Sequence, residues 1–484
     1  MAADTGGRRM RRVVLAVLAA VLVLAVASVA VLALTGRLPD GLVADPTPTP
    51  SPTVPLDPSR SAAPDVLPTE PTASGPPPAL PTAALDAVLA EPSLGGSVGA
   101  TVVDVASGQV DYDRDAAGAR TPASVVKLAT MAAALTAYGP EHRFTTSVVR
   151  GGPAQLVLVG GGDATLTTRR SRPAALPQRA SLVNLADQVV AALGPQTVPL
   201  QLAVDDSLFT GPAVSPDWPA SYVGSGVVSP VSALAVDAGR VQPGSDLREP
   251  EPALAAGRIL ARLLTRRGVD VAAEVTRATA PLGSQPLARV QSPTVAELAE
   301  LALQTSDNDL AEALLRLVAV KAGQPATFAG GAAAVLGALS SLGVATGDMV
   351  LLDGSGLARG SAVPPATLAD LLVRAAGGRP TALSALVDGL PVAGFSGTLA
   401  LRFTTGRPRA VAGVVRAKTG TLTGVSALAG TTTVGGRPTV FVVMADRVPD
   451  GATLQARDEL DRFAAVLTAG AAAGASKTPS VSGG

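Results

Sequence analysis

The segment Ser124-Val125-Val126-Lys127 opens an apolar stretch that is predicted to form a helix over residues 123–137, directly after Pro122. Proline favours the first turn of a helix, and residues three positions apart lie on one helix face. The Lys127 amine is therefore expected beside the Ser124 hydroxyl. A serine needs an adjacent base to act as a nucleophile, so the pair is a candidate catalytic site. The same spacing also arises by chance on many helices.

The composition of the chain narrows the choice of base. The 484 residues include one histidine, His142, and no cysteine. A Ser-His-Asp triad, a thiol nucleophile and a metal centre are therefore disfavoured. The only lysines are Lys127, Lys321, Lys418 and Lys477. A neutral Lys127 is the natural base, provided that burial or a neighbouring cation lowers its pKa.

Two further motifs follow in the sequence. Ser306-Asp307-Asn308 stands at the start of a predicted helix running to Val318, and Lys418-Thr419-Gly420-Thr421 follows a predicted strand over residues 411–417. Together with the first segment they form the ordered set S-x-x-K, S-D-N and K-T-G. This set is the signature of penicillin-binding proteins and class A β-lactamases. The sequence therefore predicts acyl transfer by an activated serine.

Five side chains are predicted to be catalytic. Ser124 attacks the carbonyl carbon between two terminal D-alanines, and Lys127 accepts its proton. Ser306 relays that proton to the leaving amine, while Asn308 holds the substrate amide. Lys418 places positive charge near Ser306 and helps to lower the pKa of Lys127.

Substrate binding is assigned to Thr419, Gly420 and Thr421. The two hydroxyls are expected to contact a substrate carboxylate, and the glycine to leave room for the substrate backbone. The backbone amides of Ser124 and Thr421 are expected to bind the oxyanion. Asp307 is expected to be a helix cap. No metal or cofactor is expected, and the zero net charge without a basic cluster argues against nucleic acid as a partner.

On these motifs the chain resembles the D-alanyl-D-alanine carboxypeptidase/endopeptidase family, the class C low-molecular-mass penicillin-binding proteins of peptidase family S13. From Ser124 to Ser306 is 182 residues, a longer gap than in a β-lactamase and one that indicates an inserted unit. A glycine-rich turn and three other stretches agree with the resemblance: 160–166, 229–234, 353–357 and 394–399. Ser355 and Ser396 in them are either cleft residues or parts of the loops.

The resemblance implies an α/β (α+β) fold, in which an antiparallel transpeptidase sheet is flanked by helices and carries inserted smaller domains. Strands predicted near both ends of the chain suggest a single sheet built from distant segments. These strands and the helix that follows them span 98–103, 109–112, 428–434, 439–445 and 454–467. The expected catalytic domain comprises residues 83–144 and 250–470, with 145–249 inserted.

The N-terminal region indicates where in the cell the protein is located. Val13–Leu34 is an apolar run of 22 residues preceded by four arginines, long enough to cross roughly 30 Å of hydrocarbon. We expect a cytoplasmic segment at 1–12, a retained membrane anchor at 13–35 and a proline-rich linker at 36–82. The catalytic domain then lies on the cell-wall side, before a disordered tail at 471–484. A cleaved signal peptide is the alternative.

Peptidoglycan stem peptides ending in D-Ala-D-Ala are the expected substrates, and β-lactams the expected covalent inhibitors. A class A-like β-lactamase would need a deacylating glutamate, and between Asn308 and Lys418 the only one is Glu312, on the helix of the second motif. We therefore expect slow deacylation. A catalytically silent cell-wall binding protein also remains open, as does the balance between carboxypeptidase and endopeptidase activity.

Overall fold

The computed structural model describes residues 79–171, 176–194 and 198–470. All of them belong to one of the two compact units of the chain, the unit that begins at residue 71. The predicted anchor at 13–35, nearly all of the linker and the tail lie outside the described residues. Within the described part, no helix is both long and apolar enough to cross a membrane.

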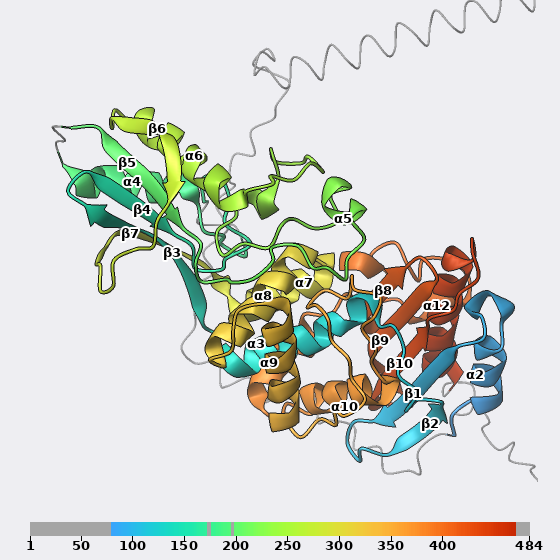
Figure 1. The fold of residues 1–484 in the computed structure, drawn as a ribbon. Helices are drawn as coiled ribbons and strands as arrows, with labels where there is room; N and C mark the ends of the chain where they lie inside the picture. The colour runs from blue at the N-terminus through green and yellow to red at the C-terminus, as the bar shows by residue number, and fades with distance from the viewer. Residues whose placement is uncertain (1–78, 172–175, 195–197, 471–484) are drawn as a thin grey trace, which may run out of the picture. The chain divides into compact units, whose positions relative to one another are not determined.

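The first sheet is antiparallel and joins the two ends of the folded chain, as the sequence predicts. Its strand order is β2-β1-β10-β9-β8, and Figure 1 shows the blue N-terminal strands beside the red C-terminal ones. Val102 of β1 lies opposite Phe441 of β10. The strands are β1 (Val98–Asp104), β2 (Val110–Arg114), β8 (Arg416–Leu422), β9 (Val425–Val434) and β10 (Arg437–Ala445).

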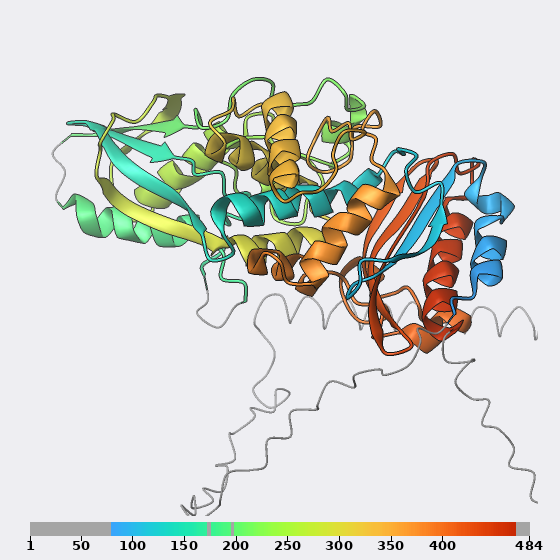
Figure 2. The same ribbon diagram turned by 90° about the horizontal axis from the view of Figure 1, so that it is seen from below.

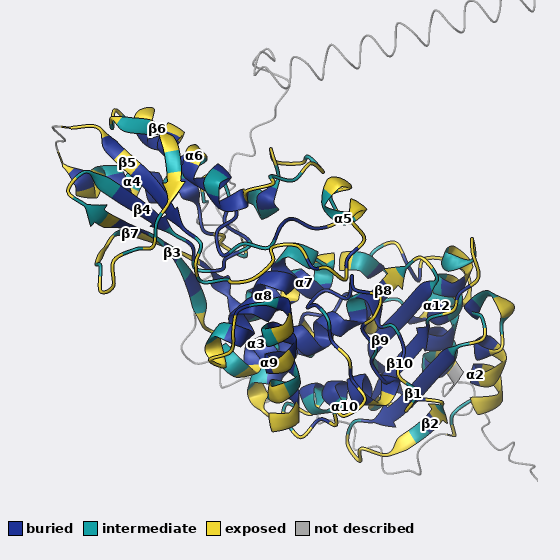
Figure 3. Cartoon of the chain, in the orientation of Figure 1, coloured by how far each residue is buried: buried dark blue, intermediate teal, exposed yellow. Residues whose placement is uncertain are grey.

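Helices cover both faces of this sheet, which explains why β10 is apolar throughout. Val442 packs into the core beneath α3 and α10, whereas the adjacent Phe441 packs into a second core against α12. Figure 3 shows β9 and β10 as buried strands. Complete burial of such side chains stabilises the fold by about 1.5–3 kcal/mol each. Figure 2 shows α2 (Thr82–Leu89) beside α12 (Thr453–Gly470), the two helices that pack together on one side.

The helices that follow the second sheet, together with those on one face of the first, form a cluster around α3 (Lys127–Tyr138). Residues 127–135 of α3 are all buried, as expected for a helix that is apolar on every side. Burial of α3 therefore also buries Lys127 at its N-terminus. The surrounding helices are α7 (Val295–Thr305), α8 (Asn308–Lys321), α9 (Phe328–Ser341), α10 (Pro365–Ala376) and α11 (Ser384–Asp388).

A second sheet forms the inserted unit, with strand order β6-β5-β4-β3-β7. Its elements are β3 (Arg143–Gly152), β4 (Gln155–Val159), α4 (Leu182–Leu193), β5 (Leu200–Asp205), α5 (Ser221–Gly224), α6 (Pro252–Thr265), β6 (Val271–Arg277) and β7 (Pro286–Thr294). The predicted insertion of 145–249 is too short. Because β7 returns to pair with β3, the insertion extends to residue 294.

Two local predictions are also corrected. The helix expected over 123–137 begins as a short 3-10 helix, and the strand expected over 411–417 begins only at Arg416 and continues through the K-T-G motif. The last motif therefore lies within a strand. The 3-10 segments are η1 (Pro92–Leu94), η2 (Ala123–Val126), η3 (Asp237–Gly239), η4 (Thr381–Leu383), η5 (Gly397–Leu399) and η6 (Arg407–Val411).

Candidate active site

Ser124 lies in η2, a tight turn with an unfavourable backbone conformation. The preceding Ala123 has φ 46°, in the left-handed region that non-glycine residues rarely adopt. Gly356 packs against this turn so closely that a Cβ there would lie 2.0 Å from the Ala123 carbonyl oxygen. Strained residues of this kind persist where the surrounding structure fixes them. The turn that carries Ser124 is therefore held by the loop that contains Gly356.

Lys127 Nζ lies among three oxygen atoms. It is 3.0 Å from Ser124 Oγ, 2.8 Å from Asn308 Oδ1 and 2.8 Å from the Ser355 carbonyl oxygen. The side chain is fully buried, and burial lowers its pKa to about 8, although the Glu312 carboxylate acts in the opposite direction. The expected contact between Lys127 and Ser124 is confirmed. The third contact of Lys127 Nζ is with the backbone carbonyl oxygen of Ser355, not with its side chain.

A second serine–lysine contact joins the other two motifs. Lys418 Nζ lies 3.0 Å from Ser306 Oγ and donates to the Thr419 carbonyl oxygen at 2.8 Å. Burial, followed by the charge of Lys127, holds the pKa of Lys418 well below its usual value. Lys418 was expected to help lower the pKa of Lys127, whereas the charge effect that is found is the lowering of the Lys418 pKa by Lys127. The largest cause of the lowered pKa of Lys127 is nevertheless burial.

The second motif forms the junction of two helices. Ser306 ends α7 in a left-handed conformation with φ 56°, and Asp307 Oδ1 accepts a hydrogen bond from the Leu310 amide at 2.9 Å. Asp307 is thus the N-cap of α8, as predicted. The cap lets α8 begin at Asn308, whose side chain is directed to Lys127.

The K-T-G motif lies along β8 against the turn that carries Ser124. A Cβ on Gly420 would lie 2.7 Å from the Pro122 carbonyl oxygen. Glycine is therefore required by packing on that side, where room for a substrate was expected. Thr419 donates to Thr398 Oγ1 at 3.0 Å, and Thr421 is exposed.

Two buried carboxylates beside the site were not predicted to take part in it. Glu312 accepts hydrogen bonds from the amides of Gly354 and Ser355, and Asp353 accepts one from the Trp218 indole at 2.8 Å. Burial raises the pKa of Glu312 to about 8, and the Asp353 charge adds to that rise. The stretch 353–357 was singled out in the sequence, but its hydrogen bonds to α8 had no local signal.

The inserted unit also reaches the second motif. The carbonyl oxygen of Val227 accepts a hydrogen bond from Asn308 Nδ2 at 2.9 Å. The residue that directly follows, Asp309, accepts a hydrogen bond from the Ser229 amide at 2.6 Å and pairs with Arg248 at 3.2 Å. Asn308 is therefore held between Lys127 and the insertion.

The two serines singled out in the loops have different environments. Ser355 is fully buried, and its Oγ has no hydrogen-bond partner among the described residues. Ser396 Oγ accepts a hydrogen bond from the Val392 amide at 3.0 Å, which makes it part of a turn. The sequence left open whether each serine lines the cleft or belongs to the loop structure. Of the two, Ser355 is the serine that contacts Lys127.

An antiparallel sheet flanked by helices, with the three motifs gathered in one place, defines the class of penicillin-binding serine hydrolases. The model of the D-Ala-D-Ala carboxypeptidase 3 (S13) family matches residues 81–250 and 244–467, and the chain belongs to this family. It is accordingly an enzyme, a serine-type D-Ala-D-Ala carboxypeptidase. The expected family is therefore confirmed.

Known relatives agree with this assignment. The chain is 37% identical over 457 residues to the carboxypeptidase DacB of Mycolicibacterium smegmatis, covering 93% of this chain and 95% of that protein. It is 33% identical to a D-alanyl-D-alanine carboxypeptidase of an Actinomadura species, over 72% of this chain and 77% of the relative. The crystal structure of penicillin binding protein 4 from Haemophilus influenzae has the same fold, with a TM-score of 0.65, 24% identity and coverage of 80% and 99%.

Proposed function

We propose that the enzyme forms an acyl-enzyme on Ser124 with Lys127 as the general base. The observation that carries this proposal is the set of three oxygen atoms around Lys127 Nζ. A neutral amine has two N–H bonds and one lone pair. Asn308 Oδ1 and the Ser355 carbonyl oxygen accept the two N–H bonds, so the lone pair is directed at Ser124 Oγ.

The remaining motif residues complete the reaction. The Ser124 hydroxyl transfers its proton to Lys127 while its oxygen attacks the scissile carbonyl, and the amides of Ser124 and Thr421 stabilise the oxyanion. Lys418 holds the Ser306 hydroxyl in place. Ser306 then relays the proton accepted by Lys127 to the leaving amine. Hydrolysis of the ester returns Ser124.

Thr419 and Thr421 are proposed to bind the carboxylate that follows the scissile bond. Thr421 is exposed on β8, and Thr419 is two residues earlier on the same strand. Residues two apart along a strand point to the same face. The two side chains therefore lie on one face of the edge strand β8; the exposed Thr421 hydroxyl offers a donor directly, and the Thr419 hydroxyl would turn from Thr398 to the carboxylate.

The proposed substrates are peptidoglycan stem peptides ending in D-Ala-D-Ala, with endopeptidase cleavage of cross-links as a second activity of the same site. Curated relatives carry the name D-alanyl-D-alanine carboxypeptidase. The Haemophilus influenzae protein of the same fold has been crystallised with a β-lactam. We propose that β-lactams acylate Ser124 in the same way.

Slow deacylation is part of the proposal. Glu312 is fully buried and its carboxylate is bound to the amides of Gly354 and Ser355, so it is not placed to activate a water molecule. This favours a penicillin-sensitive peptidase over a β-lactamase.

We also propose that the enzyme is tethered to the cytoplasmic membrane. The apolar run at 13–35 and the proline-rich segment at 36–82 support this location. The catalytic domain would then act on the cell-wall side. Release of the protein from membranes only by detergent would support the anchor, and recovery as a soluble chain lacking residues 1–35 would contradict it.

The acyl-enzyme is tested by incubating the full chain with a labelled penicillin and locating the adduct by peptide mass spectrometry. A stable adduct on Ser124 is expected. An adduct elsewhere, or none, would contradict the proposal and favour a silent binding protein. Rapid turnover of the drug would favour a β-lactamase.

A further inference from the structure

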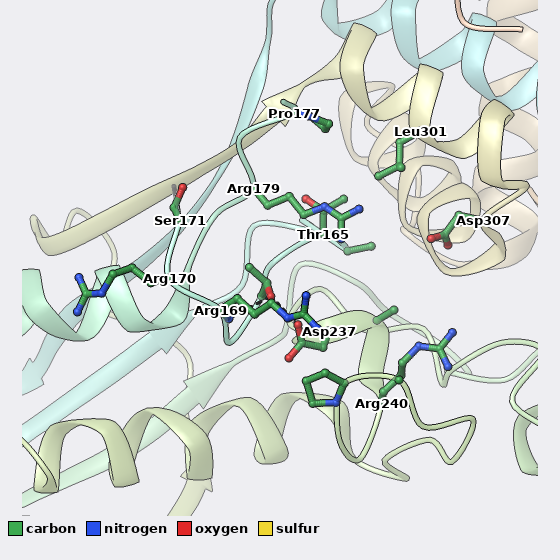
Figure 4. A pocket seen from close by; sticks show the side chains of 15 residues that line it. Thr165, Arg169, Arg170, Ser171, Pro177, Arg179, Asp237, Arg240, Leu301 and Asp307 are labelled. Carbon is green, nitrogen blue, oxygen red and sulfur yellow. Dashed lines mark hydrogen bonds between the residues drawn. The ribbon is translucent and has the colours of Figure 1, made fainter. Parts of the chain in front are cut away.

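The inserted unit faces the catalytic helices in two places. In one of them, a pocket lies between Thr165 of the insertion and Asp307 of the second motif (Figure 4). In the other, residues 210–229 contact the helices directly, and we call this stretch the bridging segment. Its carbonyl oxygen at Val227 accepts the hydrogen bond from Asn308. The bridging segment therefore touches the candidate active site.

Trp218 anchors the bridging segment. It is the only tryptophan of the chain, and within residues 210–227 only Trp218 and Ser215 are buried. The indole ring packs edge-on against Phe328 of α9, with ring centroids 5.1 Å apart, a favourable arrangement for an aromatic pair. One large buried side chain thus fixes the middle of a segment whose other residues are mostly exposed.

The polar end of Trp218 is also used. Its indole N–H donates to Asp353 Oδ2 at 2.8 Å. The same carboxylate accepts hydrogen bonds from the amides of Gly356 and Ala358, at 2.8 and 2.6 Å, and so closes its own loop. Burial raises the pKa of Asp353, whereas these three donors favour its charged form. Loss of the indole N–H would remove one donor from a carboxylate that water does not reach.

The loop that Asp353 closes carries the carbonyl oxygen beside the proposed base. Ser355 follows Asp353 by two residues, and its carbonyl oxygen lies 2.8 Å from Lys127 Nζ. Glu312 accepts hydrogen bonds from loop amides on the α8 side, and Trp218 holds Asp353 on the insertion side. The orientation of this carbonyl group therefore depends on support from both sides.

We propose that Trp218 is a positioning residue for the general base and acts through Asp353 on the Ser355 carbonyl oxygen. The inference rests on the proposed function, in which Lys127 accepts the proton of Ser124. If the carbonyl group turns away, one N–H of Lys127 loses its acceptor, and the lone pair is no longer directed at Ser124 Oγ. The insertion thereby takes part in forming the catalytic base.

The test removes the indole N–H and keeps the shape of the ring. Because the chain has one tryptophan, a tryptophan auxotroph supplied with benzothienylalanine, which carries sulfur in place of the N–H, changes Trp218 alone. We expect the acylation rate constant at saturating labelled penicillin to fall about tenfold, since a hydrogen bond to a charged group is lost. The dissociation constant for penicillin before acylation should stay within about twofold of wild type, because the lost bond is not made to the drug.

Two controls separate the hydrogen bond from packing. Full-length enzyme carrying 5-fluorotryptophan retains the N–H and should be acylated within about twofold of the wild-type rate. Phe328→Leu removes the aromatic partner of Trp218 and leaves the N–H in place. It should lower the thermal midpoint of unfolding and keep the acylation rate constant within about twofold of wild type.

The route through Asp353 has its own test. In Asp353→Ala the acceptor is absent, so enzymes carrying tryptophan and benzothienylalanine should be acylated at equal rates, as expected when two changes remove the same interaction. Trp218→Phe, made in an ordinary host, should lower the acylation rate constant in the same way as the sulfur analogue.

Four results would overturn the proposal: a wild-type acylation rate constant with the sulfur analogue, an equal loss with 5-fluorotryptophan, a loss confined to the dissociation constant for penicillin, or a further loss in the Asp353→Ala enzyme. Failure of the proposed function is distinguishable from these, since it would appear as absent acylation of Ser124 in the wild type.

Discussion

The carbonyl oxygen of Ser355 lies 2.8 Å from the Nζ atom of Lys127. These residues are far apart in the sequence, and the contact depends on Glu312, which accepts hydrogen bonds from the amides of Gly354 and Ser355. A buried carboxylate thus orients the peptide group that takes one N–H of the proposed base. Positioning of Lys127 is shared between a loop and α8.

Replacement of the proposed base is the first prediction. Lys127→Ala should lower the rate of penicillin acylation by about 10³-fold, because Ser124 loses the group that accepts its proton. Stopped-flow acylation with a labelled penicillin measures this rate, and circular dichroism checks the fold. Acylation within tenfold of wild type in a folded variant would refute the role of Lys127.

The pH dependence of acylation follows from the lowered pKa of Lys127, about 8. The base acts in its neutral form, so the acylation rate should rise as pH increases and level off above about 8. Below that pH the rate should fall by about tenfold per unit, since the protonated amine cannot accept the Ser124 proton. A flat profile between pH 6 and 9 would contradict this assignment.

Substitution of Glu312 should move that profile. Near pH 8 and above, where Glu312 is itself ionised, its carboxylate raises the pKa of Lys127, so Glu312→Gln should shift the midpoint of the acylation profile to lower pH. The amide oxygen can still accept from Ser355, so the fold should persist. Glu300→Gln, on the exposed side of α7, is the control. An acylation profile with an unchanged midpoint pH would show that Glu312 does not influence the pKa of Lys127.

The ion pair between Arg248 and Asp309 links the insertion to the first turn of α8. The side chains are 3% and 12% exposed, so Arg248→Ala leaves a buried carboxylate unpaired and should lower the free energy of unfolding by about 3 kcal/mol. Acylation should also slow, because Asn308 adjoins Asp309. Arg258→Ala breaks only the more exposed, 3.9 Å pair with Glu249 and should cost less than about 1 kcal/mol. Equal losses in denaturant titrations would contradict the prediction.

Close packing of β8 against the turn before Ser124 gives the last prediction. Gly420→Ala places a Cβ 2.7 Å from the Pro122 carbonyl oxygen, and such overpacking costs about 1–3 kcal/mol. Displacement of the turn should slow penicillin acylation at least about tenfold. Gly337→Ala, on an exposed helical position with open space around it, should leave acylation unchanged. Normal acylation by Gly420→Ala would show that the turn adjusts without loss.

Several structural features were predictable because their signals are local. Ser124 and Lys127 share one helical turn, Asp307 is a cap residue directly before a helix, and the apolar runs of β9 and β10 are typical of buried strands. The sheet built from both ends of the chain also followed from strand patterns. The end of the insertion could not be predicted from local patterns, because the pairing of β7 with β3 joins segments separated by more than one hundred residues.

The sequence by itself determined which residues form the candidate site, because each motif occupies one helix turn, one helix junction or one strand. Only the tertiary structure decided the environment of Ser124 and Lys127: complete burial of the amine, the Ser355 carbonyl oxygen beside it, and Asn308 held by the Val227 carbonyl oxygen of the insertion. The physical reason is that burial and hydrogen-bond geometry arise from contacts between remote segments, and a local pattern does not encode those contacts.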